Sequence, residues 1–315
     1  MTQVVVVGEC MLELVSQDQD QDQGQDRDWQ LGYAGDSFNT ALYLARLQVP
    51  VAYLTALGAD PFSDDMRAGW TREGIDTSMV LTDPSRLPGL YAIRNDVDGE
   101  RHFYYWRERS AARQLFALPG IDAALTRARR AQWLFLSGIT LSIYTPAERE
   151  RLVHTAAAVR ANGGQVVFDP NYRPALWGGA AQAREAFAAL APAVTLALPT
   201  HADEAMLFGD TDPLQSVARW QHQGATEVII KLGAQGCLAA AGAETSTIAP
   251  TASVAPVDTT GAGDAFNAAY LAGRIAGLAP SAAARGAHRL AGAVIQHRGA
   301  ILSRERMAAL GNLWD

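Results

Sequence analysis

The sequence is poor in the residues that build disulfide frameworks and metal centres. Its two cysteines, Cys10 and Cys237, lie far apart and outside any Cys-x-x-Cys spacing, so neither a disulfide scaffold nor a zinc knuckle is expected. The six histidines are scattered, and no His-Glu-x-x-His occurs, which argues against a histidine-based metal site. Both thiols are expected to stay reduced, as in the cytoplasm.

Several catalytic and targeting signatures are also missing. The chain has no Walker loop, no Gly-x-Ser-x-Gly elbow and no Gly-x-Gly-x-x-Gly after its first apolar segment, which argues against P-loop enzymes, α/β-hydrolases and dinucleotide-binding oxidoreductases. No apolar run is long enough to cross a membrane, and the first residues carry no basic leader. We therefore expect neither membrane anchoring nor secretion.

Positive charge is scarce as well. The formal net charge is -7, which argues against nucleic acid or an anionic membrane as the main partner. An anionic small molecule would need basic residues gathered locally. The 315 residues are 49% hydrophobic, enough for a globular protein with a sizeable core.

Apolar strands alternate with helical segments along most of the chain. The pattern predicts strands at 4–7, 51–56, 133–137, 166–169, 194–198 and 227–231, and helices at 38–47, 61–73, 146–162, 262–276 and 281–297. Residues 237–240 and 246–248 favour an antiparallel edge. This alternation is typical of an α/β fold with a mostly parallel central sheet and helices on both faces.

Two short strands at 90–95 and 101–106 interrupt this alternation. Asp98-Gly99 between them is a strong hairpin signal, and the hairpin is rich in Tyr and Arg. Such an insertion often forms a lid, although its aromatic side chains also suit packing against a second subunit. Residues 17–28 alternate Gln and Asp without an apolar residue, which indicates a solvated, mobile loop.

Residues 258–270, DTTGAGDAFNAAY, form an anion-cradle pattern near the end of the chain. Gly261 and Gly263 let the backbone turn tightly at the start of a helix, where free N–H groups and the helix dipole favour a phosphoryl group. Asp264 is a carboxylate beside this cradle, which suits a base that accepts a proton from an attacking hydroxyl. The alternative is that Asp264 only caps the helix.

This motif resembles the C-terminal signature of the ribokinase-like (PfkB) sugar kinases, and Gly35 with Asn39 matches their N-terminal signature. The order of the two signatures also agrees. More narrowly, residues 8–14, 87–91, 99–107 and 169–174 are similar to 2-keto-3-deoxygluconate kinases. The resemblance runs from about residue 4 to about residue 301.

The resemblance implies ATP-dependent phosphorylation of the C6 hydroxyl of 2-keto-3-deoxygluconate. It implies a single kinase domain over 1–315, with a lid from about 9–35 and 88–110. The hairpin itself suggests a homo-oligomer, a dimer in which two lids clasp each other or a higher assembly. The resemblance further implies Mg²⁺, with a monovalent cation as an additional candidate.

The same resemblance assigns roles to individual residues. Asp264 is the base, and the amides of Gly261, Ala262 and Gly263 hold the migrating phosphoryl group. The sugar acid contacts Gly35, Asn39, Tyr91, Tyr105, Arg107, Arg173 and Asp264. The residues that border ATP are Asn171, Arg173, Lys231, Gly233, Ala234, Gly236, Gly261 and Gly263. A carboxylate substrate fits this set, because Arg107 and Arg173 each offer a bidentate fork.

The chain departs from the family pattern at two places. Many relatives carry Asn-x-x-Glu near the metal, whereas this chain has Thr200-x-x-Asp203 followed by Glu204; Asp203 and Glu204 are therefore the candidate metal ligands. Some relatives also place an acid after the Arg-Gly near the C-terminus, where this chain has Ala300.

The sequence is also compatible with other functions. A fructokinase or ribokinase would prefer a neutral sugar and tolerate the loss of Arg107. A non-catalytic sugar- or nucleotide-binding protein could use the same fold. Taken alone, Arg107 also fits a surface salt bridge, and Arg173 fits a structural link within its own loop.

Overall fold

The computed structural model describes residues 3–16, 28–95, 101–252 and 254–315. A nine-stranded sheet forms its centre, in the order β13-β12-β11-β10-β9-β8-β1-β4-β5. The strands are β1 (Val4–Val7), β4 (Val51–Gly58), β5 (Val80–Asp83), β8 (Trp133–Ser137), β9 (Gln165–Asp169), β10 (Leu196–Ala197), β11 (Glu227–Lys231), β12 (Cys237–Ala241) and β13 (Glu244–Ile248). Only the β11, β12 and β13 pairs are antiparallel, which confirms the predicted mostly parallel α/β fold.

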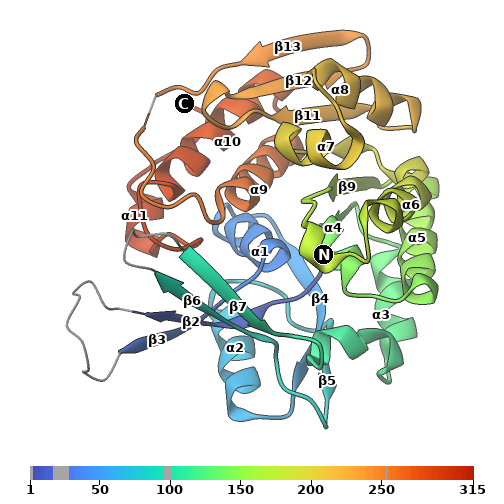
Figure 1. The fold of residues 1–315 in the computed structure, drawn as a ribbon, viewed down its shortest axis with the longest axis vertical. Coiled ribbons are helices and arrows are strands. Elements are labelled where there is room, and N and C mark those ends of the chain that lie inside the picture. Colours follow the sequence, from blue (N-terminus) through green and yellow to red (C-terminus); the bar gives the residue numbers. More distant parts are fainter. Residues whose placement is uncertain (1–2, 17–27, 96–100, 253) are drawn as a thin grey trace.

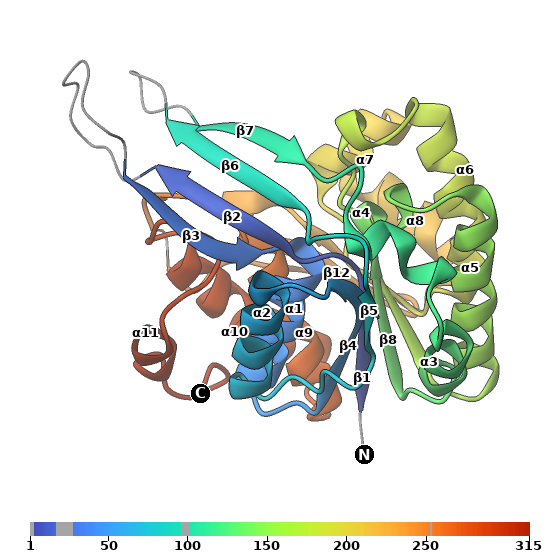
Figure 2. The same cartoon turned by 90° about the horizontal axis from the view of Figure 1, so that it is seen from below.

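Helices cover both faces of this sheet (Figures 1 and 2). One layer contains α1 (Asp36–Arg46), α2 (Pro61–Arg72), α9 (Ala262–Ile275) and α10 (Pro280–Val294). The other contains α3 (Ile121–Ala128), α5 (Pro146–Ala161), α6 (Ala180–Leu190) and α8 (Pro213–His222). Strand β1 contributes side chains to both hydrophobic cores, because successive side chains on a strand point to opposite faces. Val5 and Val7 pack into one core, and Val4 and Val6 pack into the other.

Most predicted elements match the structure within a few residues. One clear difference is the strand predicted at 194–198, which is reduced to β10 (Leu196–Ala197); another is the helix predicted at 281–297, which ends at Val294. The backbone still bonds to β9 at both ends of the predicted strand, from Thr195 N to Val166 O and from Leu198 N to Phe168 O, both at 2.9 Å. The Thr195 hydroxyl adds a second link, since it accepts from Val166 N at 2.9 Å.

A small sheet with the order β3-β2-β6-β7 stands away from the main body (Figure 2). Its strands, β2 (Met11–Ser16), β3 (Trp29–Ala34), β6 (Leu90–Asn95) and β7 (Arg101–Trp106), lie within the two segments expected to form the lid. The hairpin strands are confirmed. The Asp98-Gly99 turn and the Gln/Asp-rich tract, apart from Asp28, lie outside the described residues.

The small sheet has two different faces. The inner face carries the buried Met11, Ala34, Tyr91 and Ile93. The outer face carries a row formed by Leu31, Leu14, Ala92 and Tyr104 across the four strands. Leu31 is 48% and Tyr104 49% exposed, so this face presents apolar surface to solvent.

The parallel strands direct the polar loops to one edge of the large sheet. Because their carboxyl ends meet there, the residues after β9 and β11 lie close to the start of α9. Shorter helices complete the fold: α4 (Gly138–Ser142), α7 (His201–Phe208) and α11 (Arg304–Ala308). Within the described residues, none of the helices combines the length and the apolar character that a membrane span requires.

Candidate active site

The turn before α9 is held in an unusual backbone conformation. Gly261 is the N-cap of α9 with φ 75°, in the left-handed region, where glycine is favoured. A Cβ at this position would lie 2.6 Å from the Cβ of Ala300. The Asp258 carboxylate supports the turn, accepting from Thr260 N (3.0 Å) and from Gly299 N (2.7 Å). A glycine at 261 is therefore required twice, by φ and by close contact.

The first turn of α9 contains the amides that were predicted to form an anion cradle. Ala265 N is bonded to Gly261 O (2.9 Å), so the Gly263 and Asp264 amides precede the first donor that has a partner within the helix. The Ala262 amide donates to Thr259 O (3.3 Å) and so has a partner within the turn. The cradle therefore offers at least two amides at the positive end of a helix dipole.

Asp264 is buried at 9% exposure and accepts a hydrogen bond from Asn39 Nδ2 at 2.8 Å. Burial raises the pKa of this carboxyl to about 7, and the nearby Asp36 carboxylate acts in the same direction. The reading of Asp264 as a helix cap is wrong, because Gly261 occupies the N-cap and Asp264 bonds to another helix. A carboxyl that titrates near neutral pH is suited to general base chemistry.

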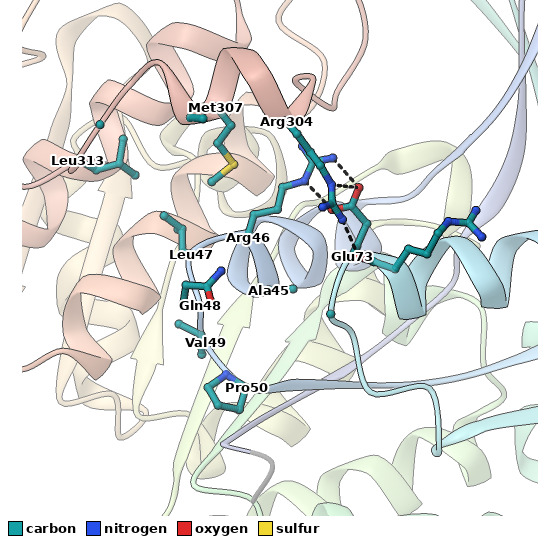
Figure 3. A pocket seen from close by; sticks show the side chains of 14 residues that line it. Ala45, Arg46, Leu47, Gln48, Val49, Pro50, Glu73, Arg304, Met307 and Leu313 are labelled. Atoms are coloured by element: carbon teal, nitrogen blue, oxygen red, sulfur yellow. Dashed lines mark hydrogen bonds and ion pairs between the residues drawn. The ribbon is translucent and has the colours of Figure 1, made fainter.

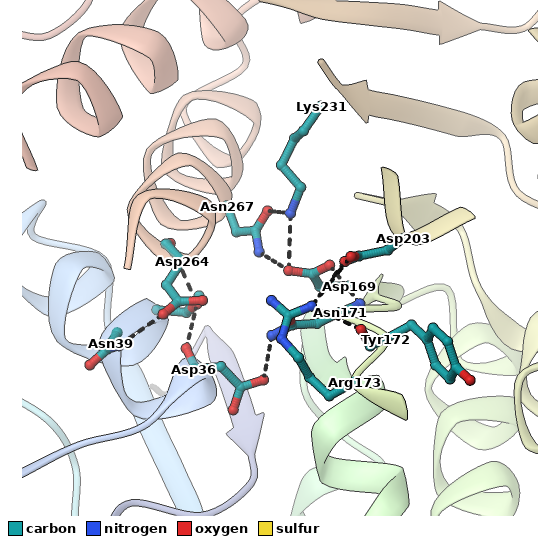
Figure 4. Close-up of polar contacts among 11 residues, drawn as sticks. Asp36, Asn39, Asp169, Asn171, Tyr172, Arg173, Asp203, Lys231, Asp264 and Asn267 are labelled. Carbon is teal, nitrogen blue, oxygen red and sulfur yellow. Dashed lines mark hydrogen bonds and ion pairs between the residues drawn. The ribbon is translucent and has the colours of Figure 1, made fainter. Parts of the chain in front are cut away.

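The start of α1 lies opposite Asp264 (Figure 4). A Cβ on Gly35 would lie 2.3 Å from Glu9 O, so the absence of a side chain lets the chain enter α1 beside residue 9. The next residue, Asp36, was not among the predicted site residues. Burial raises the pKa of Asp36, and Asn171 Nδ2 donates to it at 3.2 Å. Its position directly after Gly35, in the first turn of a helix, was the available signal.

A second buried polar cluster lies behind the cradle. Lys231 Nζ donates to Asp169 Oδ2 and to Asn267 Oδ1, both at 3.0 Å, and Asn267 Nδ2 donates to Asp169 Oδ2 at 2.6 Å. Lys231 Nζ also lies 3.7 Å from the ideal Cβ position of Gly263. Lys231 was predicted to border ATP, whereas Asp169 and Asn267 were missed. Together they hold an ammonium group beside the first turn of α9.

The loop after β9 brings Asn171 and Arg173 to the same edge. Asn171 has φ 34°, in the left-handed region, and its side chain reaches Asp36. Arg173 Nη1 lies 3.3 Å from both carboxylate oxygens of Asp203. The Arg173 side chain is 51% exposed and points into the space between these residues (Figure 4). The predicted residues of this loop are thus brought together with Asp264.

The two candidate metal ligands have different partners. Asp203 contacts Arg173, and burial raises its pKa. Glu204 is fully buried and accepts from Arg219 (2.6 Å) and from Trp220 Nε1 (3.0 Å). Burial raises the pKa of Glu204 to about 7, although Arg219 opposes the shift. Glu204 therefore serves the packing of α7 on α8, and only Asp203 faces the site.

The lid residues are held partly by acidic side chains. The Tyr91 hydroxyl donates to Glu13. Arg107 is 5% exposed and donates to Glu9, so it forms a buried ion pair and not the surface salt bridge considered above. Burial raises the pKa of the half-exposed Tyr105, and the nearby guanidinium groups of Arg107 and Arg173 oppose this shift. The Tyr105 hydroxyl is therefore near enough to both arginines to be affected by their charge.

The predicted ATP loop follows β11 directly. Gly233, Ala234 and Gln235 form a short 3-10 turn, with Gly233 at φ 59°. A Cβ on Gly236, at φ 95°, would lie 2.1 Å from Ile248 O. The loop therefore starts from the strand end that carries Lys231 and runs tightly against β13.

A separate cavity of about 570 Å³ lies at the far end of α1. Figure 3 shows Arg46 and Arg304 beside Glu73 there, with Met307 and Leu313 from the C-terminal part of the chain. None of the predicted site residues lines it.

Comparisons with known proteins agree with this geometry. Residues 1–307 match the family described as pfkB family carbohydrate kinase. The chain is similar to the 2-dehydro-3-deoxygluconokinases of Dickeya dadantii (strain 3937), 40% identical over 97% of this chain and 98% of that protein, and of Escherichia coli (strain K12), 39% identical over 98% and 99%. Among solved structures it resembles a PfkB protein from Polaromonas sp. JS666, with TM-score 0.84 and 28% identity over 98% of this chain and 100% of that one.

Proposed function

The chain belongs to the pfkB family of carbohydrate kinases, and from this membership we propose that it transfers the γ-phosphoryl group of ATP to the C6 hydroxyl of 2-keto-3-deoxygluconate. The product is 2-keto-3-deoxy-6-phosphogluconate. The observation that carries the proposal is Asp264: a buried carboxyl with a pKa near 7 at the start of α9, directly beside the cradle of Gly261 to Gly263.

The proposed reaction is an in-line displacement at phosphorus. Asp264 accepts the proton of the C6 hydroxyl as the oxygen forms its bond to the γ-phosphorus, and the bond from that phosphorus to the β,γ-bridging oxygen breaks, which releases ADP. The cradle amides and the ammonium of Lys231 neutralise charge on the moving group. Gly233, Ala234 and Gly236 border the nucleotide.

Mg²⁺ needs few protein ligands in such a site, because it is usually held by one or two carboxylates together with substrate phosphates. Asp203 fits this role, since it lies at the site edge and its side chain is 15% exposed. Glu204 does not, because it is fully buried and its Oε2 already accepts from Arg219 and Trp220 in the packing of α7 on α8. Bound Mg²⁺ would supply charge neutralisation at the phosphates. For the monovalent cation we assign no residue.

The substrate carboxylate requires a cation that a neutral sugar does not. Arg173 is the better candidate, because it is half exposed and its hydrogen bonds within the described residues all come from Nη1. Arg107 lies near Tyr105 but its charge is largely balanced by Glu9, so its contribution to binding the acid is secondary to that of Arg173. Gly35, Asn39 and Tyr91 line the sugar side, together with Asp36.

The test is a coupled ATP assay with a small panel: 2-keto-3-deoxygluconate, 2-keto-3-deoxygalactonate, fructose and ribose. We expect kcat/KM for the keto-deoxy acids to exceed that for either neutral sugar by at least about a hundredfold, since a charged pair is lost with a neutral sugar. Preference for fructose or ribose would replace the proposal with the neutral-sugar alternative. Tight sugar binding without turnover would instead support a binding protein.

We also propose that two copies associate through the outer face of the small sheet. The two ends of the apolar row, Leu31 and Tyr104, are about half exposed, and Trp106 on the same face is 59% exposed, whereas Ala92 within the row is buried. A second copy offers the same row, so a two-fold interface would bury both. Sedimentation at working concentration should give a dimer, and a monomer would refute this interface.

We further propose that the protein acts in the cytoplasm, because it uses ATP and its two cysteines are buried and reduced.

A further inference from the structure

Helix α1 contacts both parts of the catalytic centre along one stripe. Asn39, Tyr43 and Arg46 are spaced at i, i+4 and i+7, which places them on the same face of a helix. Asn39 bonds the base Asp264, as described above. Tyr43 and Arg46 instead contact the segment at 300–302, far away in the sequence.

The Tyr43 hydroxyl holds this segment by two hydrogen bonds. It donates to Ala300 O at 2.8 Å and accepts from Leu302 N at 2.9 Å. Tyr43 is fully buried, and burial raises its pKa to about 12, so the hydroxyl stays protonated and can donate at physiological pH. One turn later, Arg46 Nη1 donates to Leu302 O at 2.6 Å.

The segment held by Tyr43 forms the back of the phosphoryl cradle. Ala300 stands where a side chain of Gly261 would be: its Cβ, Cα and carbonyl oxygen lie 2.6, 2.7 and 2.8 Å from the ideal Cβ position. Gly299 N is bonded to Asp258, which also holds Thr260. The left-handed Gly261 is therefore supported from behind by a segment that α1 fixes in place.

We propose that Tyr43 is a positioning residue for phosphoryl transfer. It touches neither substrate; it fixes Ala300 against Gly261, so that the amides of the first turn of α9 are aimed at the moving phosphoryl group. Asn39 holds the side chain of the base from the same helix, so α1 contacts both the base and the segment behind the cradle. This inference rests on the proposed kinase function but not on the identity of the sugar, because Tyr43 acts on the phosphoryl side.

The decisive variant is Tyr43→Phe, which removes one oxygen and keeps the ring. We expect kcat to fall by about tenfold or more, since small displacements in a catalytic centre have large effects, while KM for the sugar and for ATP stays within about twofold. The matched control is Tyr270→Phe. Tyr270 is equally buried and lies on α9, but its hydroxyl bonds to Glu227, away from the cradle.

If Tyr43 only stabilised the fold, Tyr43→Phe and Tyr270→Phe would both have a lower melting temperature, and their kcat values would be equal. If Tyr43→Phe retains kcat within twofold of the wild type, the proposal is overturned.

Ala300→Gly provides a second test, because it removes the methyl group at the Gly261 contact without changing Tyr43. We expect Ala300→Gly to lower kcat as well, and the double variant to lose less than the product of the two single losses. If the loss of kcat in the double variant equals the product of the two single losses, Tyr43 does not act through Ala300.

Two readouts separate this inference from the substrate proposal. If the wild type turns over only a neutral sugar, the substrate proposal fails and the same comparison of variants is made on that sugar. If no sugar is turned over, calorimetry replaces the rate assay. The ratio of the affinities for AMP-PNP and ADP should then be about tenfold smaller in Tyr43→Phe than in the wild type. An unchanged ratio would refute the role of Tyr43.

Discussion

The pH dependence of catalysis gives the sharpest test of the site, because two neighbours of Asp264 act on its pKa in opposite directions. The Asp36 carboxylate raises the pKa of Asp264, whereas the hydrogen bond from Asn39 lowers it. Asp36→Asn removes the first effect and Asn39→Ala removes the second. The acid limb of the rate profile should therefore move to lower pH in one variant and to higher pH in the other.

The magnitude follows from the titration of one group. With a pKa of about 7, about a tenth of the wild-type enzyme has its base deprotonated at pH 6. A shift of about one unit, roughly 1.4 kcal/mol, would bring this fraction to about half in Asp36→Asn. The same shift upward would bring it to about a hundredth in Asn39→Ala.

The assay measures kcat/KM between pH 5.5 and 9, with each profile normalised to its own plateau. Normalisation matters because Asp36 also lines the sugar pocket, so Asp36→Asn is expected to change the plateau as well as the limb. A coupling system that responds linearly to added ADP at every pH serves as the control.

Limbs that move in the same direction, or that stay at the wild-type pH in both variants, would refute the assignment of Asp264 as the titrating base. A limb that persists in Asp264→Asn would do so directly.

Further predictions concern the neighbouring features. Asp264→Asn should abolish turnover yet raise the melting temperature at pH 8 by about 4 °C, by more than at pH 5. A carboxyl whose pKa rises from 3.8 to about 7 on folding costs stability that grows as the pH rises between these two values and is complete at pH 8. Gly261→Ala should lose at least about a hundredfold in kcat, since φ 75° and the Ala300 contact both oppose a side chain; activity near wild type would contradict the required contact. Glu204→Ala should cost about 3 kcal/mol of unfolding free energy without changing the Mg²⁺ requirement, whereas Asp203→Asn should raise the half-saturating Mg²⁺ by about tenfold; the reverse pattern in a Mg²⁺ titration would restore Glu204 as the ligand. Tyr104→Glu should give a monomer by sedimentation that still folds, and an intact dimer would refute the outer-face interface.

Local patterns in the sequence were sufficient for most of the fold. Alternating apolar segments predicted the central strands, and Asp98-Gly99 predicted the β6 and β7 pair with its bounds. The glycine pair and Asp264 predicted the start of α9. These features depend on residues within a few positions of one another, which is the range over which spacing carries structural information.

The partners of the buried charges could not be predicted in the same way. Arg107 pairs with Glu9 across 98 positions, and Lys231 pairs with Asp169 across 62. Nothing in the local spacing marks Glu204 as the partner of Arg219 instead of a metal ligand. Which polar groups meet in the interior depends on how helices and strands pack, and single-sequence patterns do not encode that packing.

The link between Asn39 and Asp264 also affects how the protein is made. The two residues are 225 positions apart, so at typical synthesis rates Asp264 leaves the ribosome about 10 to 45 s after Asn39. The segment that Tyr43 holds emerges later still. The contacts of helix α1 with the proposed base and cradle therefore cannot form until most of the chain has been translated. By then the lid and the residues proposed to bind the sugar have already been synthesised. Phosphoryl transfer by the growing chain therefore requires that the C-terminal segments have first been synthesised.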